Sequence, residues 1–84
     1  MTRDEVVRKV NSILNNQLEI PMERLVPEAT LFDDLSLDSL DAVDMLVYLE
    51  DHLKVKVNVE IFKNARTVGD IYNLVSELVS VGSA

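Results

Sequence analysis

The chain has 84 residues, with 15 acidic against 8 basic side chains and a formal net charge of -7. Its length suffices for one small domain, and we expect residues 1–84 to form it. The charge excludes ordinary binding to nucleic acids or anionic membranes, which need a basic surface, and the absence of cysteine excludes disulfides, thiolate metal sites and a cysteine nucleophile.

The first predicted element is an amphipathic helix. Thr2 and Glu5 have the spacing of a capping box, so the helix should begin at Thr2. Apolar residues then recur at helical spacing along one stripe, at Val6, Val7, Val10, Ile13 and Leu14. Asn15 and Asn16 weaken the helix, and Pro21 should stop any continuation.

A long loop is predicted from about Gln17 to Leu37. It contains Pro21 and Pro27, yet it also has many apolar residues that could anchor it to a core. Long ordered loops are uncommon in compact domains and are often functional. The loop is therefore a candidate for positioning a site.

The second helix is predicted from Ser39 to about Leu53, with Asp38 as its cap and Asp41 as the capping partner. Its apolar residues are more numerous than one core-facing stripe can use. The expected core-facing residues are Met45, Leu46, Leu49 and Leu53. A different face carries Leu40, Val43 and Val47, which indicates contact with a ligand or a partner unless the helix is packed on all sides.

The rest of the chain predicts an extended connector and two further helices. Residues 53–59 alternate like a strand but have no pairing partner, so we expect a connector that leads into a short helical turn at 59–63. Thr67 and Asp70 then open the last helix as a capping pair. The predicted fold is all-α: a small four-helix bundle with three main helices and one short helix.

Ser39 is the candidate site residue. It is expected at the first position of the second helix, at the end of the long loop. A helix N-terminus offers unpaired N–H groups and partial positive charge, which suit a covalently attached phosphate. Asp38 and Asp41 oppose that effect, and a serine in an ordinary capping sequence is the alternative.

Asp38-Ser39-Leu40 resembles the phosphopantetheine attachment motif of acyl carrier proteins. The resemblance extends to Leu31-Phe32-Asp33-Asp34-Leu35, to the acidic second helix and to Thr67-Val68-Gly69-Asp70. It implies that a phosphopantetheinyl transferase (a holo-carrier synthase) attaches 4′-phosphopantetheine, donated by coenzyme A, to Ser39, with Asp38 as the flanking motif residue. It also implies a carrier of acyl thioesters rather than an enzyme, with no catalytic residue and no metal site.

The same resemblance implies a docking surface on the second helix for basic patches of acyl-transferring and acyl-modifying enzymes. Its expected residues are Leu40, Asp41, Val43, Asp44, Val47, Glu50 and Asp51. The absence of Lys and Arg between Glu28 and Asp51 agrees with such a surface, although a solvated helix face is the simpler interpretation. The resemblance further implies that Leu49, Ile71 and their neighbours line a cavity for a short acyl chain.

Some positions depart from the family pattern. Ser36 stands where the family commonly has glycine, and Tyr48 stands where a small residue is frequent. Lys54, Lys56 and Lys63 occupy a region that is usually acidic in carriers of general fatty acid synthesis. Fatty acid, specialised lipid and polyketide biosynthesis therefore all remain candidate pathways.

Other functions are also possible from the sequence. A peptidyl or aminoacyl carrier shares the arm, and a helical adaptor needs no covalent chemistry. A hydrolase is disfavoured because His52 would lie about 20 Å along the helix from Ser39, too far to act as its base. Calcium binding by an EF-hand loop is disfavoured because the central glycine of that motif is absent. No apolar run could span a membrane, so we expect a cytoplasmic protein without membrane insertion. We also expect it to be a monomer.

Overall fold

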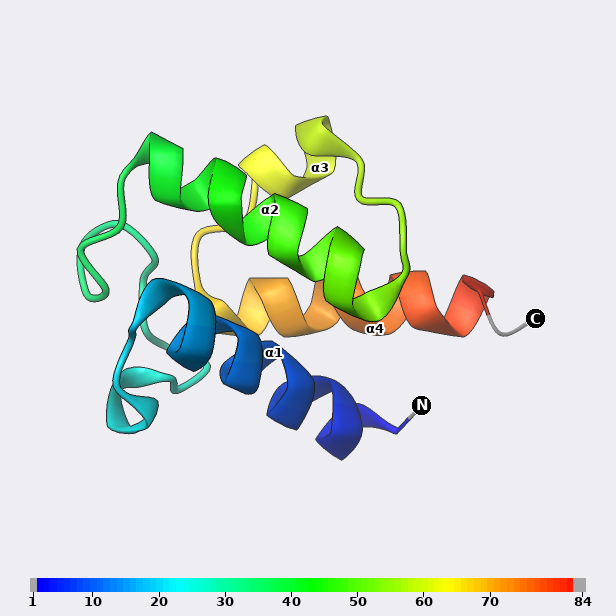
Figure 1. Ribbon diagram of the computed structural model, residues 1–84, viewed down its shortest axis with the longest axis horizontal. Coiled ribbons are helices and arrows are strands. Elements are labelled where there is room, and N and C mark those ends of the chain that lie inside the picture. The colour runs from blue at the N-terminus through cyan, green and yellow to red at the C-terminus, as the bar shows by residue number, and fades with distance from the viewer. Residues whose placement is uncertain (1, 83–84) are drawn as a thin grey trace.

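Three long helices form the body of the molecule (Figure 1). The computed structural model describes residues 2–82, with α1 at Arg3–Leu18, α2 at Ser39–Leu53 and α4 at Val68–Gly82. The short helix α3 spans Val59–Lys63, and a 3-10 turn, η1, spans Met22–Arg24. α1 runs opposite to α2 and α4 and packs against both. The all-α prediction is confirmed, and no helix within residues 2–82 is long and apolar enough to cross a membrane.

The first helix begins as predicted and ends later than predicted. Thr2 Oγ1 accepts a hydrogen bond from the Glu5 backbone N–H at 3.2 Å. α1 continues past the two asparagines to Leu18 and ends at Glu19, which has φ 58°. Asn15 does not break the helix, because its side-chain amide donates to the Ile20 carbonyl at 2.7 Å and ties the chain beyond the helix back to α1.

The core lies between the three long helices. Its fully buried aliphatic and thioether side chains are Val6, Val10, Leu14, Met45, Leu49, Val68, Ile71 and Val75. Tyr72, which the apolar periodicity did not single out, is buried as well, and its hydroxyl donates to Asn11 Oδ1. Burial raises the pKa of Tyr72, because the phenolate would be desolvated.

The long loop between α1 and α2 is held in place by backbone hydrogen bonds to the start of α4. Leu31 N–H donates to the Arg66 carbonyl at 2.9 Å, and Val68 N–H donates to the Ala29 carbonyl at 3.0 Å. Gly69 N–H donates to the Pro27 carbonyl at 3.0 Å, and a Cβ at Gly69 would come within 3.1 Å of that oxygen. The glycine therefore lets the loop approach α4 closely.

The segment after α2 is an extended connector followed by α3, as predicted. The Val57 backbone N–H donates to Glu50 Oε2 at 2.9 Å, which ties the connector to α2. Asn58 caps α3 by accepting from the Glu60 N–H at 2.8 Å, and Phe62 buries the inner side of this short helix. These contacts fix α3 beside α2.

The Asp70 carboxylate stabilises the start of α4 through hydrogen bonds. Its contribution to the stability of the fold should decrease in acid. Asp70 Oδ2 accepts from the backbone N–H groups of Arg66 at 2.9 Å and Thr67 at 3.2 Å. The Arg66 hydrogen bond is the main cause of a lowered Asp70 pKa, and desolvation partly opposes it. Because the folded-state pKa lies below the unfolded-state value, this stabilisation is present above the unfolded pKa and is lost as pH falls through the folded pKa.

Asp70→Ala is therefore expected to lower the free energy of unfolding by about 1 kcal/mol near neutral pH. Urea unfolding at about pH 7 and about pH 3 measures the difference between variant and parent. The difference should shrink at the lower pH, because protonation of the Asp70 carboxylate weakens the hydrogen bonds that it accepts. An equal difference at both pH values would contradict a role for the ionised carboxylate.

Candidate functional site

Ser39 is an exposed residue at the first position of α2, where the sequence predicts it. A complete capping box holds this end of the helix. Asp38 Oδ1 accepts from the Asp41 N–H at 2.9 Å, and Asp41 Oδ2 accepts from the Asp38 N–H at 3.2 Å. Both carboxylates are engaged with the backbone, so the position of Ser39 is set by its neighbours rather than by its own side chain.

Ser36 stands at a position where the family pattern commonly has glycine, and its backbone conformation is one that favours glycine. Its φ is 57°, in the left-handed region that glycine adopts without cost. Leu35 and Leu37 on either side are buried, and Leu37 N–H donates to the Leu31 carbonyl at 3.1 Å. These two anchors hold Ser36 in a conformation that costs a residue with a Cβ about 1–2 kcal/mol.

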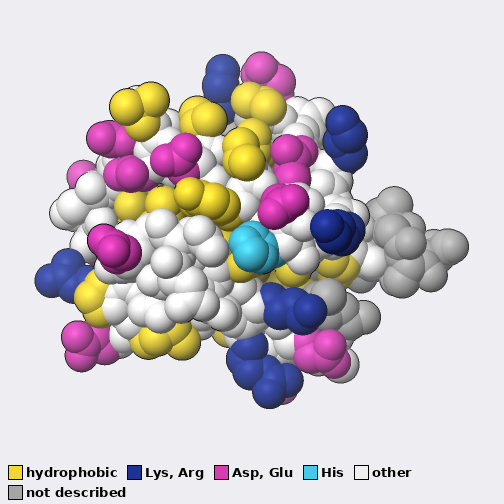
Figure 2. Space-filling model, viewed as in Figure 1, with side chains coloured by type: hydrophobic (Ala, Val, Ile, Leu, Met, Phe, Trp, Pro, Cys, Tyr) yellow, Lys and Arg dark blue, Asp and Glu magenta, His cyan; other side chains and the backbone are white. Residues whose placement is uncertain are grey.

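The outward face of α2 carries a mixed apolar and acidic stripe. Four of the predicted docking residues recur at helical spacing along it: Leu40, Asp44, Val47 and Asp51. Leu40 is 75% exposed and Val47 is 52% exposed, in contrast to Leu49 on the opposite side, which is fully buried. Figure 2 shows acidic and hydrophobic side chains interleaved over α2. We call these four residues the α2 stripe.

A second side of α2 faces α3. Ser39, Val43, Leu46 and Glu50 follow one another at helical spacing on this side. The first three border an apolar hollow, and Glu50 holds the connector at Val57. The carboxylate of Glu50, predicted to contact partners, is therefore also a structural group of this protein.

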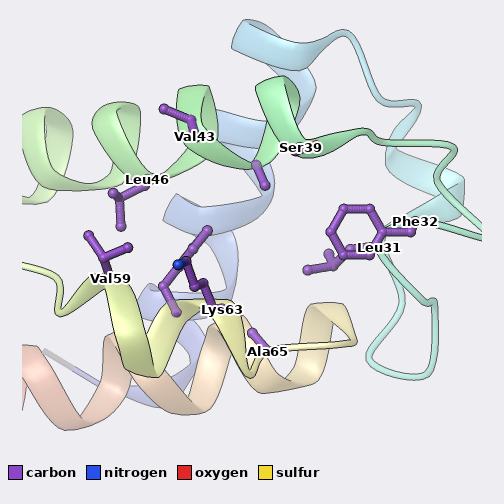
Figure 3. Close-up of a pocket in the computed structure, with 10 residues that line it drawn as sticks. Leu31, Phe32, Ser39, Val43, Leu46, Val59, Lys63 and Ala65 are labelled. Carbon is purple, nitrogen blue, oxygen red and sulfur yellow. The ribbon is translucent and has the colours of Figure 1, made fainter.

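The hollow lies between α2, α3 and the end of the long loop (Figure 3). Its volume is about 200 Å³. It is lined by Leu31, Phe32, Ser39, Ala42, Val43, Leu46, Val59, Phe62, Lys63 and Ala65. In Figure 3 the Ser39 side chain points from the first turn of α2 toward this space. Ser39 thus lies at the border between solvent and an apolar cavity.

Leu49 and Ile71, which the resemblance places beside a cavity for an acyl chain, do not line this hollow. Both side chains are fully buried in the core, and neither is among the residues that line the hollow. The hollow lies between α2 and α3, because α3 covers α2 with the buried Phe62 and the half-exposed Val59. The sequence signal for this arrangement was the apolar character of the short segment 59–62.

The structure brings no histidine to Ser39. His52 lies near the other end of α2, with its ring centroid 6.5 Å from that of Tyr48. The thirteen-residue separation on one helix corresponds to about 20 Å. Within residues 2–82 there is also no group of three or more His, Cys, Asp or Glu side chains placed to hold a metal ion. The candidate site thus consists of an exposed hydroxyl, the α2 stripe and an apolar hollow.

Comparison with known proteins gives consistent matches across almost the whole chain. Residues 8–75 match the protein family described as "Phosphopantetheine attachment site". The chain is 39% identical to acyl carrier protein 2 of Ralstonia nicotianae over 80 residues, which covers 95% of this chain and 99% of the relative. It is 34% identical to the acyl carrier protein of Thermosynechococcus vestitus, with the same coverage of both chains.

A solved structure supports the same comparison. The acyl carrier protein from Enterococcus faecalis superposes with a TM-score of 0.75 at 28% sequence identity. The match covers 93% of this chain and 99% of that chain. The sequence and the arrangement of the helices therefore point to the same family.

Proposed function

This chain belongs to the family that bears the phosphopantetheine attachment site, and we propose that Ser39 is the residue that carries the 4′-phosphopantetheine arm. The function of the chain is that of an acyl carrier protein, which is a carrier and not an enzyme. The arm supplies a terminal thiol for thioesters, which this cysteine-free chain lacks. Within this proposal residues 1–84 form one carrier domain that works as a cytoplasmic monomer, as the sequence predicts.

The observation that carries the proposal is the placement of Ser39. Its side chain is exposed at the first position of α2, so a transferase can reach the hydroxyl. The Asp38–Asp41 capping box fixes the backbone on both sides of it. The unpaired N–H groups of this helix end are suited to a phosphodiester on Ser39. Among the described residues, Ser39 is therefore the best candidate for attachment of the arm.

The hollow beside Ser39 suits an acyl chain attached to the arm. It opens next to the attachment residue and is lined almost entirely by apolar side chains. An apolar cavity of about 150 Å³ accommodates benzene, so about 200 Å³ has room for a short acyl chain. We propose that the hollow shelters such a chain from water between encounters with enzymes.

The α2 stripe is proposed to be the surface that partner enzymes read. Its apolar residues, Leu40 and Val47, supply contact area, and its carboxylates, Asp44 and Asp51, attract basic patches on those partners. Such charges mainly govern the rate of encounter and are screened by salt. The expected partners are the phosphopantetheinyl transferase and the enzymes that transfer or modify the acyl group.

Asp44→Lys is expected to lower kcat/KM for loading of the arm about tenfold at low salt. The reason is that a positive charge on the α2 stripe repels the basic patch of the transferase. Initial rates of loading with coenzyme A measure the effect, and it should become smaller as salt concentration rises. Glu77→Lys is the matched control, because it makes the same charge change at an exposed position of α4, away from the α2 stripe.

An equal loss of rate in the Asp44 and Glu77 variants would show that overall charge, not the α2 stripe, controls docking. The same variants can be compared for any acyl-transferring enzyme that acts on the loaded protein. If several partners use the α2 stripe, the Asp44 variant should lose reaction rate to a similar extent with each of them.

The proposed attachment site is tested by loading the parent protein. The chain is incubated with coenzyme A and a promiscuous phosphopantetheinyl transferase, and its intact mass is measured. We expect the mass of one phosphopantetheine group to be added. Peptide fragmentation must place the group on Ser39, because Ser36 is only three residues away. No added mass, or a group on another residue, would overturn the proposal.

A further inference from the structure

Lys63 is the one charged side chain among the described residues that line the hollow. It is the last residue of α3, and it is exposed. Figure 3 shows its side chain rising from α3 toward α2, into the space that Leu46 and Val59 border. The cation therefore lies at the mouth of an otherwise apolar cavity that also reaches Ser39.

An acyl chain in the hollow would change the surroundings of this amine. The methylene stem of a lysine packs along apolar surface while its ammonium group stays in water. A chain that fills the hollow packs against the stem and brings its own end group near the ammonium, which attracts a negatively charged end group. A purely aliphatic acyl group offers no acceptor beyond its thioester, whereas a carboxylate on the acyl group does.

We propose that the hollow selects short acyl groups that bear a free carboxylate, such as half-thioesters of dicarboxylic acids, and that Lys63 pairs with this carboxylate. The inference rests on the attachment of the arm at Ser39. The carbon chain contacts Leu46, Val59 and Phe62, and the charged end remains at the mouth, where the ammonium group lies. Lys63 is thus a specificity-determining residue for the cargo, whereas the α2 stripe determines which enzymes dock.

The test measures the pKa of the carried carboxylate. A promiscuous transferase loads the protein from succinyl-coenzyme A that is labelled with carbon-13 at the free carboxylate, and NMR follows its titration. In Lys63→Met the succinyl pKa should be higher than in the parent by about 0.5–1 unit, because an opposite charge nearby favours the ionised form. Lys56→Met is the matched control, since Lys56 is exposed on the connector and does not line the hollow.

Butyryl-coenzyme A supplies a cargo with the same number of carbons and no carboxylate. The methyl resonances of Leu46 and Val59 report whether each cargo enters the hollow. Lys63→Met should reduce the shift changes caused by the succinyl group and leave those caused by the butyryl group unchanged.

The outcomes separate this inference from the proposed function. Equal succinyl pKa values in the parent and in Lys63→Met would overturn the pairing. An increase in Lys56→Met as large as that in Lys63→Met would also overturn it, because overall charge would then explain the effect. Failure to load Ser39 at all would overturn the attachment proposal itself, which is recognised from intact mass before any titration.

Discussion

Ser39→Ala is expected to abolish attachment of the arm while leaving the fold intact. The change removes the hydroxyl that the phosphodiester requires. It leaves the capping box in place, because the box is formed by the Asp38 and Asp41 side chains and backbone. Alanine is a good helix former, and the Ser39 side chain is exposed, so the free energy of unfolding should change by less than about 0.5 kcal/mol. Intact mass after incubation with coenzyme A and the transferase measures the loss.

Ser36→Gly is the matched control for this variant. It removes the other serine of the segment and suits the positive φ of 57° at that position. We expect Ser36→Gly to load fully and to be more stable than the parent by about 0.5–1 kcal/mol. Loading of Ser39→Ala to the parent level would refute the assignment, and so would loss of loading in Ser36→Gly with Ser39 unchanged.

The beginnings of the helices were predictable from the sequence because each is marked by a local side-chain contact. Thr2, Asp38 and Thr67 each stand three residues before an acidic partner, and the structure shows the corresponding capping hydrogen bonds. The end of α1 was not predictable in this way. Asn15 is a poor helix former in isolation, yet its bond to the Ile20 carbonyl depends on where the chain turns after the helix.

The location of the hollow could not be predicted from helical periodicity alone. Burial of Leu49 and Ile71 is required by periodicity, but periodicity does not say whether a buried side chain faces a packed core or a cavity. That distinction depends on where the five-residue α3 lies, and α3 is placed by the bond between Glu50 and the Val57 backbone. Such a contact between a helix and a distant backbone group has no signature in the spacing of residues.

Ser39 shows that a site residue can be predicted from the sequence although its surroundings cannot. The Asp38-Ser39-Leu40 motif predicts the attachment residue through resemblance. The structure adds that the hydroxyl borders a cavity whose mouth carries Lys63. In the proposed function a single helix, α2, thus carries the attachment point at its start, the α2 stripe on the side that partners read and the hollow on the side of α3. Cargo and partner can therefore be selected by different sides of one element.

Leu49→Ala is expected to lower the free energy of unfolding by about 3 kcal/mol, the largest loss that we predict for a single substitution in this chain. Leu49 is fully buried between α2 and the other long helices, so truncation removes apolar contacts and leaves a cavity. For a domain of this size, 1 kcal/mol corresponds to about 4–8 °C in Tm. The expected decrease is therefore about 12–24 °C, measured by circular dichroism during heating.

Leu40→Ala makes the same chemical change on the opposite face of the same helix. Leu40 is 75% exposed, so its truncation should change the free energy of unfolding by less than about 0.5 kcal/mol. It should nevertheless slow loading of the arm, because Leu40 supplies apolar contact area next to Ser39 on the α2 stripe. Leu49→Ala should load normally at a temperature where it remains folded. If Leu40→Ala lost as much stability as Leu49→Ala, or loaded as fast as the parent, the division of α2 into a core side and a partner side would be wrong.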